Sequence, residues 1–323
     1  MNSEEKALEI IRNKKALVLS GGGTLGVAEV SSLIRLSELG LDIKKIKSVS
    51  GSSVGSIIST AIACGGSLYY IENKMINLDF KKLNNKSFIL CDAIRLLKNF
   101  GLYSMSEIRN LVSEVLLDLV GDKDITFKQL FDKTGIHLTI TYLSFNYGRT
   151  IFADYIYEPD SLVREAVVKS SAIPVFYEAY FNKKDKKHKE IIVDGGVMAN
   201  FPMEIPHFQG YKHEEIIGLK FISSEDVFVK DKGQPGTEEE WKEGPTNILS
   251  YLNDLVQILR DQAMKVHVKE NDWKNTVKID VGNLSSTDFD MTEEDKEWLY
   301  KQGQKAAEDY IIDLINLIEK NKY

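Results

Sequence analysis

Hydrophobic residues along the chain fall into two alternating patterns. Apolar runs as short as a β-strand are separated by longer stretches in which apolar residues recur at helical spacing. This alternation over 323 residues predicts a large α/β domain. The runs that predict strands are Lys15–Ser20, Ile43–Ser50, His137–Asn146, Arg149–Ala153, Tyr177–Phe181, Glu190–Val193, Ile216–Ser223 and Thr276–Val281. The clearest helical stretches are Val27–Leu39, Val54–Cys64, Ser161–Ser171 and Thr292–Lys320.

The remaining segments indicate how the chain is organised. Residues 1–14 predict an N-terminal helix, and residues 67–122 carry two apolar faces at helical spacing, which predict a helical cap. The charged stretch Ser224–Pro245 is typical of a loop, and a helix is expected over Thr246–Lys269. We therefore expect a main domain at 15–207 that includes the cap. A strand and helix extension at 208–323 should pack on the same domain.

The composition is that of a globular protein with an acidic balance. With 43% hydrophobic residues, 28% charged residues and a net charge of -7, the chain has no broad basic surface, and no nucleic-acid partner is expected. Its first residues lack the order of a secretory signal, and no apolar run reaches the roughly 18 residues of a membrane span. We expect a cytoplasmic protein, with signal-independent export and the oligomeric state left open.

One basic segment departs from this acidic balance. Five lysines lie between Asn182 and Lys189, at the expected tip of a hairpin. A solvated tip is the simpler interpretation. Peripheral contact with an anionic membrane surface stays open as the alternative.

A serine flanked by small residues follows the second expected strand. Gly51-Ser52-Ser53-Val54-Gly55 fits the G-x-S-x-G pattern, in which the central serine is a nucleophile in a strand-to-helix turn. Glycines are needed there because strand and helix backbones come close together. The N-terminus of the following helix would stabilise a developing negative charge beside Ser53. The alternative is a tight helix entry without chemistry.

A glycine-rich loop follows the first expected strand. The segment Gly21-Gly22-Gly23-Thr24-Leu25-Gly26 also fits the dinucleotide-binding fingerprint, which needs an acidic residue at the end of the next strand. Here that strand ends in Ser48-Val49-Ser50, so nucleotide binding is the less favoured interpretation. The favoured one is a loop whose backbone N–H groups bind an oxyanion.

An aspartate with two glycines follows a later apolar strand. Asp194-Gly195-Gly196 comes directly after Glu190–Val193, where an α/β sheet presents polar groups at its carboxyl edge. Taken alone, the segment is more typical of an Asp-Gly turn.

The order and spacing of these three motifs resemble those of the patatin-like phospholipases. The glycine loop resembles the family's oxyanion loop, Gly51–Gly55 its nucleophile elbow and Asp194–Gly196 its catalytic Asp-Gly motif. Ser171–Phe176 and Ala199–Pro202 resemble two further family blocks. One position departs from the family pattern, because Leu25 stands where a basic residue is usual.

The resemblance implies a fold and a mechanism. The fold is a three-layer α/β/α sandwich around a mainly parallel sheet, with 15–207 as the catalytic domain. Ser53 is the nucleophile and Asp194 the base of a Ser-Asp dyad that cleaves acyl esters of phospholipids or other glycerolipids. No cofactor or metal is implied. The oxyanion hole is formed by Gly21, Gly22 and Gly23, and the supporting glycines are Gly26, Gly51, Gly55, Gly195 and Gly196.

Two alternatives to this function stay open. A non-hydrolytic lipid- or partner-binding protein could keep the fold, and Leu25 is the feature that favours it. A serine hydrolase with a histidine base is the other, and His207 is then the leading candidate because Ser53, Asp194 and His207 follow the chain order of α/β-hydrolases.

Overall fold

The computed structural model describes residues 2–83, 89–183, 189–222, 252, 255 and 271–320. The expected loop Ser224–Pro245, the lysine-rich tip at 184–188 and nearly all of the helix expected over Thr246–Lys269 lie outside these residues. None of the described helices is both long and apolar enough to cross a membrane.

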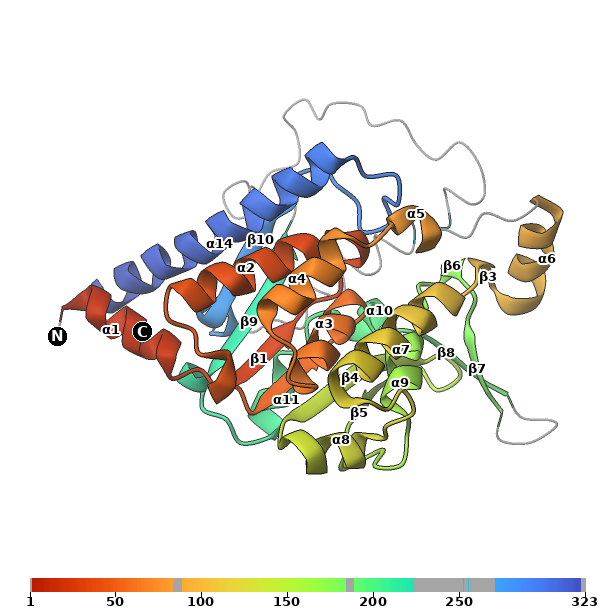
Figure 1. Cartoon of the computed structure of the whole chain (residues 1–323), viewed down its shortest axis with the longest axis horizontal. Coiled ribbons are helices and arrows are strands. Elements are labelled where there is room, and N and C mark those ends of the chain that lie inside the picture. Colours follow the sequence, from red (N-terminus) through yellow and green to blue (C-terminus); the bar gives the residue numbers. More distant parts are fainter. Residues whose placement is uncertain are drawn as a thin grey trace.

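An eight-stranded sheet forms the centre of the molecule (Figure 1). Its strands are β1 Ala16–Leu19, β2 Ser48–Gly51, β4 His137–Ser144, β5 Arg149–Ala153, β7 Tyr180–Lys183, β8 Lys189–Asp194, β9 Ile216–Ile222 and β10 Thr276–Asp280. They follow the order β10-β9-β1-β2-β4-β8-β7, with β5 also paired to β4. The first five strands of this order run parallel, whereas β5, β7 and β8 are antiparallel to their neighbours. The mainly parallel α/β fold is thus confirmed.

Helices and short turns surround the sheet. The helices are α1 Ser3–Arg12, α2 Gly26–Glu38, α3 Val54–Ala63, α4 Leu68–Ile76, α5 Phe80–Leu83, α6 Ile89–Asn99, α7 Ser106–Val120, α8 Phe127–Thr134, α9 Val163–Ser170, α10 Gly196–Ala199, α11 Glu204–Phe208 and α14 Glu293–Glu319. The 3₁₀ turns among the described residues are η1 Gly23–Leu25, η2 Ile43–Lys45, η3 His213–Glu215 and η4 Asp272–Asn275. A separate parallel pair joins β3 Gly101–Tyr103 to β6 Val175–Tyr177. Residues 67–122 therefore contain α4 to α7 and the short strand β3.

Different segments cover the two faces of the sheet. Side chains alternate along β1 between the two faces. Leu17 and Leu19 belong to the large core shared with α2, α3 and α14. Ala16 and Val18 face the other way and pack with Phe201, between α10 and α11. The sheet is therefore covered on both faces, in three layers.

The C-terminal helix α14 lies along α2 (Figure 1). The Ser31 hydroxyl of α2 donates to the Tyr300 carbonyl at 2.8 Å. A Cβ on Gly303 would lie only 2.0 Å from the Ala28 carbonyl oxygen, so glycine is what allows this close contact. Thr292 caps the helix by accepting the N–H of Asp295 at 3.1 Å.

The strand expected over Ile43–Ser50 is shorter in the structure. It begins only at Ser48, because Ile43–Lys45 forms η2. The side chain of Asp42 accepts the N–H of Lys44 at 3.0 Å. Such local side-chain bonds compete with strand pairing, and the apolar pattern alone did not reveal this one.

Candidate active site

Ser53 occupies a sharp turn between β2 and α3. Its backbone has φ 50° and ψ −123°, outside the ordinary strand and helix regions. Such a conformation costs about 1–3 kcal/mol and is concentrated at functional sites. The N–H of Ser53 donates to the Ser170 hydroxyl at 2.9 Å, which holds the turn. The serine is 2% exposed and lies at the N-terminus of α3.

Two glycines allow β2 and α3 to come together. A Cβ on Gly51 would lie 2.4 Å from the Gly55 carbonyl oxygen. A Cβ on Gly55 would lie 2.5 Å from the Leu19 carbonyl oxygen of β1. Both distances are well inside van der Waals contact, so larger residues would push the helix away from the sheet and displace Ser53.

The glycine loop lies directly against Ser53. A Cβ on Gly21 would be 3.1 Å from the Ser53 Cβ. The Gly21 N–H already donates to the Asn200 carbonyl at 3.0 Å, so it is not free to bind an oxyanion. In the part of the chain that the structure describes, the N–H groups of Gly22 and Gly23 have no acceptor. They are the candidate oxyanion donors.

Crowding explains why this loop is made of glycine. Gly23 has φ +53°, and a Cβ there would lie 1.9 Å from the Ser286 carbonyl oxygen. A Cβ on Gly22 would lie 2.2 Å from the ring of Phe221. Gly26, at the start of α2, packs against Val54, whose Cγ2 would lie 2.6 Å from an added Cβ.

Asp194 and the Ser53 turn are brought together by one edge of β4. At Ile140, β4 pairs with both β2 and β5, and at Tyr142 it pairs with both β5 and β8. Because a strand has only two edges, β2 and β8 must share the edge opposite β5. They run in opposite directions, so their carboxyl ends, Gly51 and Asp194, meet only two residues apart, or about 7 Å along β4.

The sequence placed Asp194 directly after a strand of a hairpin, and β8 does pair antiparallel with β7. The motif did not reveal that β8 also pairs antiparallel with β4 and so reaches the end of β2 from the opposite direction. Strand direction follows from distant pairing, which the local Asp-Gly-Gly pattern does not contain.

The segment Ser170–Ala172 binds both strand ends. Besides the hydroxyl that accepts from Ser53, Ser170 offers its carbonyl to the N–H of Gly195 at 3.4 Å. The Ala172 carbonyl accepts the N–H of Asp194 at 2.8 Å. The Asp194 side chain is completely buried, and its Oδ1 accepts the N–H of Gly196 at 2.6 Å. The two candidate catalytic residues therefore share one rigid scaffold.

An apolar slot opens beside Ser53. Its polar lining residues are Thr24, Ser53 and Ser171. The other walls come from α3, α4, α5, α7, β6 and the segment before α14, and their side chains are Val54, Ile57, Met75, Leu78, Phe80, Leu83, Ile108, Leu111, Ile173, Tyr177 and Phe289. The cavity measures only about 40 Å³, so its match to a hydrocarbon chain lies in its apolar lining and not in its size.

Comparison with known proteins identifies the family. A sequence profile described as patatin-like phospholipase matches residues 17–207. The chain belongs to the patatin-like phospholipase family.

Individual relatives extend the match beyond residue 207. Uncharacterized protein R571 of Acanthamoeba polyphaga mimivirus is 27% identical over 94% of this chain and 95% of its own length. Probable lipid hydrolase 463L of Invertebrate iridescent virus 6 is 30% identical over 59% of this chain and 62% of that protein. The crystal structure of VipD from Legionella pneumophila shares the fold, with a TM-score of 0.59 and 17% identity over 93% of this chain and 67% of that one.

The histidines that the structure describes in this patatin-like chain are bonded to carboxylates away from Ser53. His137 lies at the start of β4 and bonds Asp154 at 2.9 Å. His207 and His213 both approach Asp272. His188 and His267 lie outside the described residues. No described histidine therefore contacts the candidate nucleophile.

Two residues near the patatin-like site could not be predicted from the sequence. Ser170 ends α9 and looked like any polar helix residue. Glu29, on α2, is fully buried and accepts the N–H of Ser20 at 3.1 Å, just before the glycine loop. Burial raises the pKa of Glu29 well above its ordinary value, because the charged form loses its hydration. A glutamate at this spacing gives no sequence signal of burial.

Proposed function

We propose that the chain is a serine lipid acyl hydrolase that cleaves fatty acyl esters of phospholipids or other glycerolipids with a Ser53–Asp194 dyad. The observation that carries the proposal is the meeting of the carboxyl ends of β2 and β8 on one edge of β4, beside the glycine loop. A nucleophile, a base and oxyanion donors are then supplied by three adjacent segments.

In the proposed reaction, Ser53 Oγ attacks the ester carbonyl carbon while Asp194 takes the hydroxyl proton. The carbonyl oxygen becomes an oxyanion that the N–H groups of Gly22 and Gly23 bind. Collapse breaks the bond to the alcohol, and Asp194 returns the proton to that leaving group. Water then attacks the acyl-enzyme with the same base, releasing the fatty acid and restoring Ser53.

The surroundings of Asp194 support its role as the base. Its side chain is completely buried, and the N–H of Gly196 fixes the orientation of one carboxylate oxygen. No described histidine is available for the task, because His137, His207 and His213 each face a carboxylate elsewhere.

The slot supports the acyl part of the substrate more than the headgroup. Its walls are almost entirely apolar, as a fatty acyl chain requires. Leu25, which replaces the family's usual basic residue, is 4% exposed and part of the core. We therefore propose recognition through the acyl chain, without a cation at position 25 to bind a phosphate.

Labelling with a fluorophosphonate probe, together with ester hydrolysis, tests the proposal. The parent protein should be labelled, whereas Ser53→Ala should not. Ser52→Ala is the matched control, since the adjacent buried hydroxyl has no hydrogen-bond partner among the described residues. Asp194→Asn should lower turnover by about 10³ or more, and adding it to Ser53→Ala should lower turnover by less than about tenfold further.

The same assay distinguishes the dyad from a histidine mechanism. His207→Gln and His137→Gln should each keep turnover within about tenfold of the parent, because a histidine base is worth about 10⁴. A folded His207→Gln protein as inactive as Ser53→Ala would overturn the dyad. A folded parent that is neither labelled nor active would favour the non-hydrolytic alternative.

A further inference from the structure

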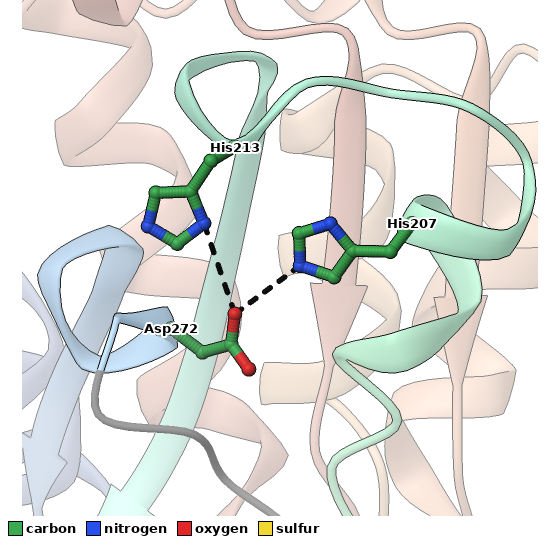
Figure 2. Close-up of side chains that lie close together, drawn as sticks. All are labelled: His207, His213 and Asp272. Atoms are coloured by element: carbon green, nitrogen blue, oxygen red, sulfur yellow. Dashed lines mark hydrogen bonds and ion pairs between the residues drawn. The ribbon is translucent and has the colours of Figure 1, made fainter.

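Two histidines and an aspartate converge near the amino-terminal ends of β9 and β10 (Figure 2). His213 and Asp272 open the turns η3 and η4, which lead directly into β9 and β10. His207 lies on α11, on the chain leading to η3. Gly51, just before Ser53, and Leu219 of β9 both pair with Leu19 of β1, so they lie at the same height in the sheet. The cluster comes before Ile216, three residues earlier along β9. The candidate active site and the cluster are therefore about 10 Å or more apart along the strand direction.

The three side chains point at one another. His207 Nε2 lies 3.2 Å from Asp272 Oδ1, and His213 Nδ1 lies 3.8 Å from the same oxygen. The two imidazole rings are nearly parallel, with 5.9 Å between their centroids. One potential ligand atom from each residue lies within 4.8 Å of the others.

We propose that His207, His213 and Asp272 form a binding site for a divalent transition metal of the zinc type, separate from the candidate active site. Two imidazole nitrogens and a carboxylate oxygen are donors that zinc prefers, whereas magnesium and calcium prefer oxygen alone. Ligands about 2.0–2.1 Å from a tetrahedral zinc are about 3.4 Å apart, close to the 3.2 Å and 3.8 Å found here.

The exposure of the three residues fits this role. The histidine side chains are 31% and 32% exposed, so a metal can enter and the rings can close the remaining gap. The Asp272 side chain is only 5% exposed. Its carboxylate would therefore be the buried ligand at the bottom of the site. A water molecule can take the fourth position of a zinc ion.

The nearby buried cation is bonded to groups outside the cluster. The Lys14 ammonium donates to the Ile216 carbonyl and to Asn275 Oδ1, which are both neutral acceptors.

A metal here would join parts of the chain that are distant in sequence. His207 and Asp272 are 65 residues apart, and Asp272 leads into β10, at the edge of the sheet. A ligand set that closes so long a loop in the folded state alone stabilises that state. The proposed role is therefore structural.

Zinc titration of chelator-treated protein tests the site. We expect one equivalent to bind, and a melting temperature about 5 °C higher when free zinc is about a hundredfold above its dissociation constant. His207→Gln, His213→Gln and Asp272→Asn should each weaken binding by about tenfold or more. Ester hydrolysis by the parent should not need the metal.

Two variants control for other histidines and charges. His137→Gln removes a histidine paired with a carboxylate elsewhere, and Glu214→Gln removes an exposed charge next to His213. Both should bind zinc as the parent does. Binding that all five variants weaken equally, or no stoichiometric binding, would overturn the proposal. So would cluster variants that lower the melting temperature equally with zinc and with chelator, since the cluster would then be held by hydrogen bonds alone.

Discussion

Ser53 keeps a strained backbone because its neighbours leave no alternative. Its N–H donates to the Ser170 hydroxyl. Gly51 and Gly55, on either side, have no Cβ and so allow close backbone contacts around the turn from β2 into α3. A backbone strain of about 1–3 kcal/mol persists only where the surrounding contacts hold the residue this firmly. Ser53 and its flanking glycines could be predicted from five consecutive residues. The role of Ser170, 117 positions away, could not, because it depends on where α9 ends in space.

The burial of Glu29 could not be predicted from the sequence. Glu29 lies in a helical pattern where a glutamate is normally assigned to solvent. In the structure, one carboxyl oxygen accepts the N–H of Ser20, and the other has no hydrogen-bond partner among the described residues. The acid is therefore more stable with its proton than without it.

Glu29→Gln should change how stability depends on pH. A folded pKa above the unfolded value means that the folded state holds the proton more tightly. The stabilisation is fully present below the unfolded pKa, near 4.5, and is lost as pH rises through the folded pKa. The parent should therefore lose stability relative to Glu29→Gln above about pH 4.5, by at most about 1.4 kcal/mol per pH unit.

Urea unfolding of both proteins between pH 5 and pH 8 measures this difference. Glu165→Gln is a useful comparison, because Arg109 and Arg164 help to lower the pKa of that carboxyl despite partial burial. Its profile should not show the same loss over this range. Parallel profiles for the parent and Glu29→Gln would mean that Glu29 is not held as a neutral acid.

At the scale of elements, the candidate site combines local and distant contributions. The turn from β2 into α3 is a local strand and helix signal, and the sequence predicted it. The apolar slot is different, because its walls come from α3, α4, α5, α7 and β6. Apolar residues in the region 67–122 predict buried helix faces, but which of them face Ser53 depends on how those helices pack.

Leu111→Trp should shorten the acyl chain that the site accepts. Leu111 lines the slot from α7, so a larger ring there would fill space that a long chain needs. The ratio of p-nitrophenyl palmitate to p-nitrophenyl butyrate hydrolysis should fall by about tenfold or more. Leu117→Trp is the control, because Leu117 lies on the same helix but is 49% exposed. An unchanged ratio in an active Leu111→Trp protein would remove the slot from acyl binding.

At the scale of the whole molecule, the sheet extends beyond the segment that the family profile matches. That match ends at residue 207, yet β9 pairs with β1 in the middle of the sheet and β10 pairs with β9. The sequence predicted both strands from their apolar runs. It did not predict that the chain returns to the far side of β1, because strand order is set by contacts across about 200 residues.

The close packing of α14 on α2 can be tested by adding a side chain at Gly303. Gly303→Ala should stabilise the protein by about 1 kcal/mol if helix propensity alone decides, since glycine is a poor helix former. The structure predicts the opposite. An added Cβ would lie 2.0 Å from the Ala28 carbonyl oxygen and 2.1 Å from Ser31 Oγ, so α14 must move away from α2.

Such overpacking costs about 1–3 kcal/mol, enough to outweigh the gain in propensity. We therefore expect Gly303→Ala to lower the free energy of unfolding, measured by urea denaturation. Lys305→Ala, exposed two positions further along α14, should change it by less than about 0.5 kcal/mol. If Gly303→Ala were instead more stable than the parent, α14 could not pack on α2 as closely as the hydrogen bond from Ser31 to Tyr300 requires.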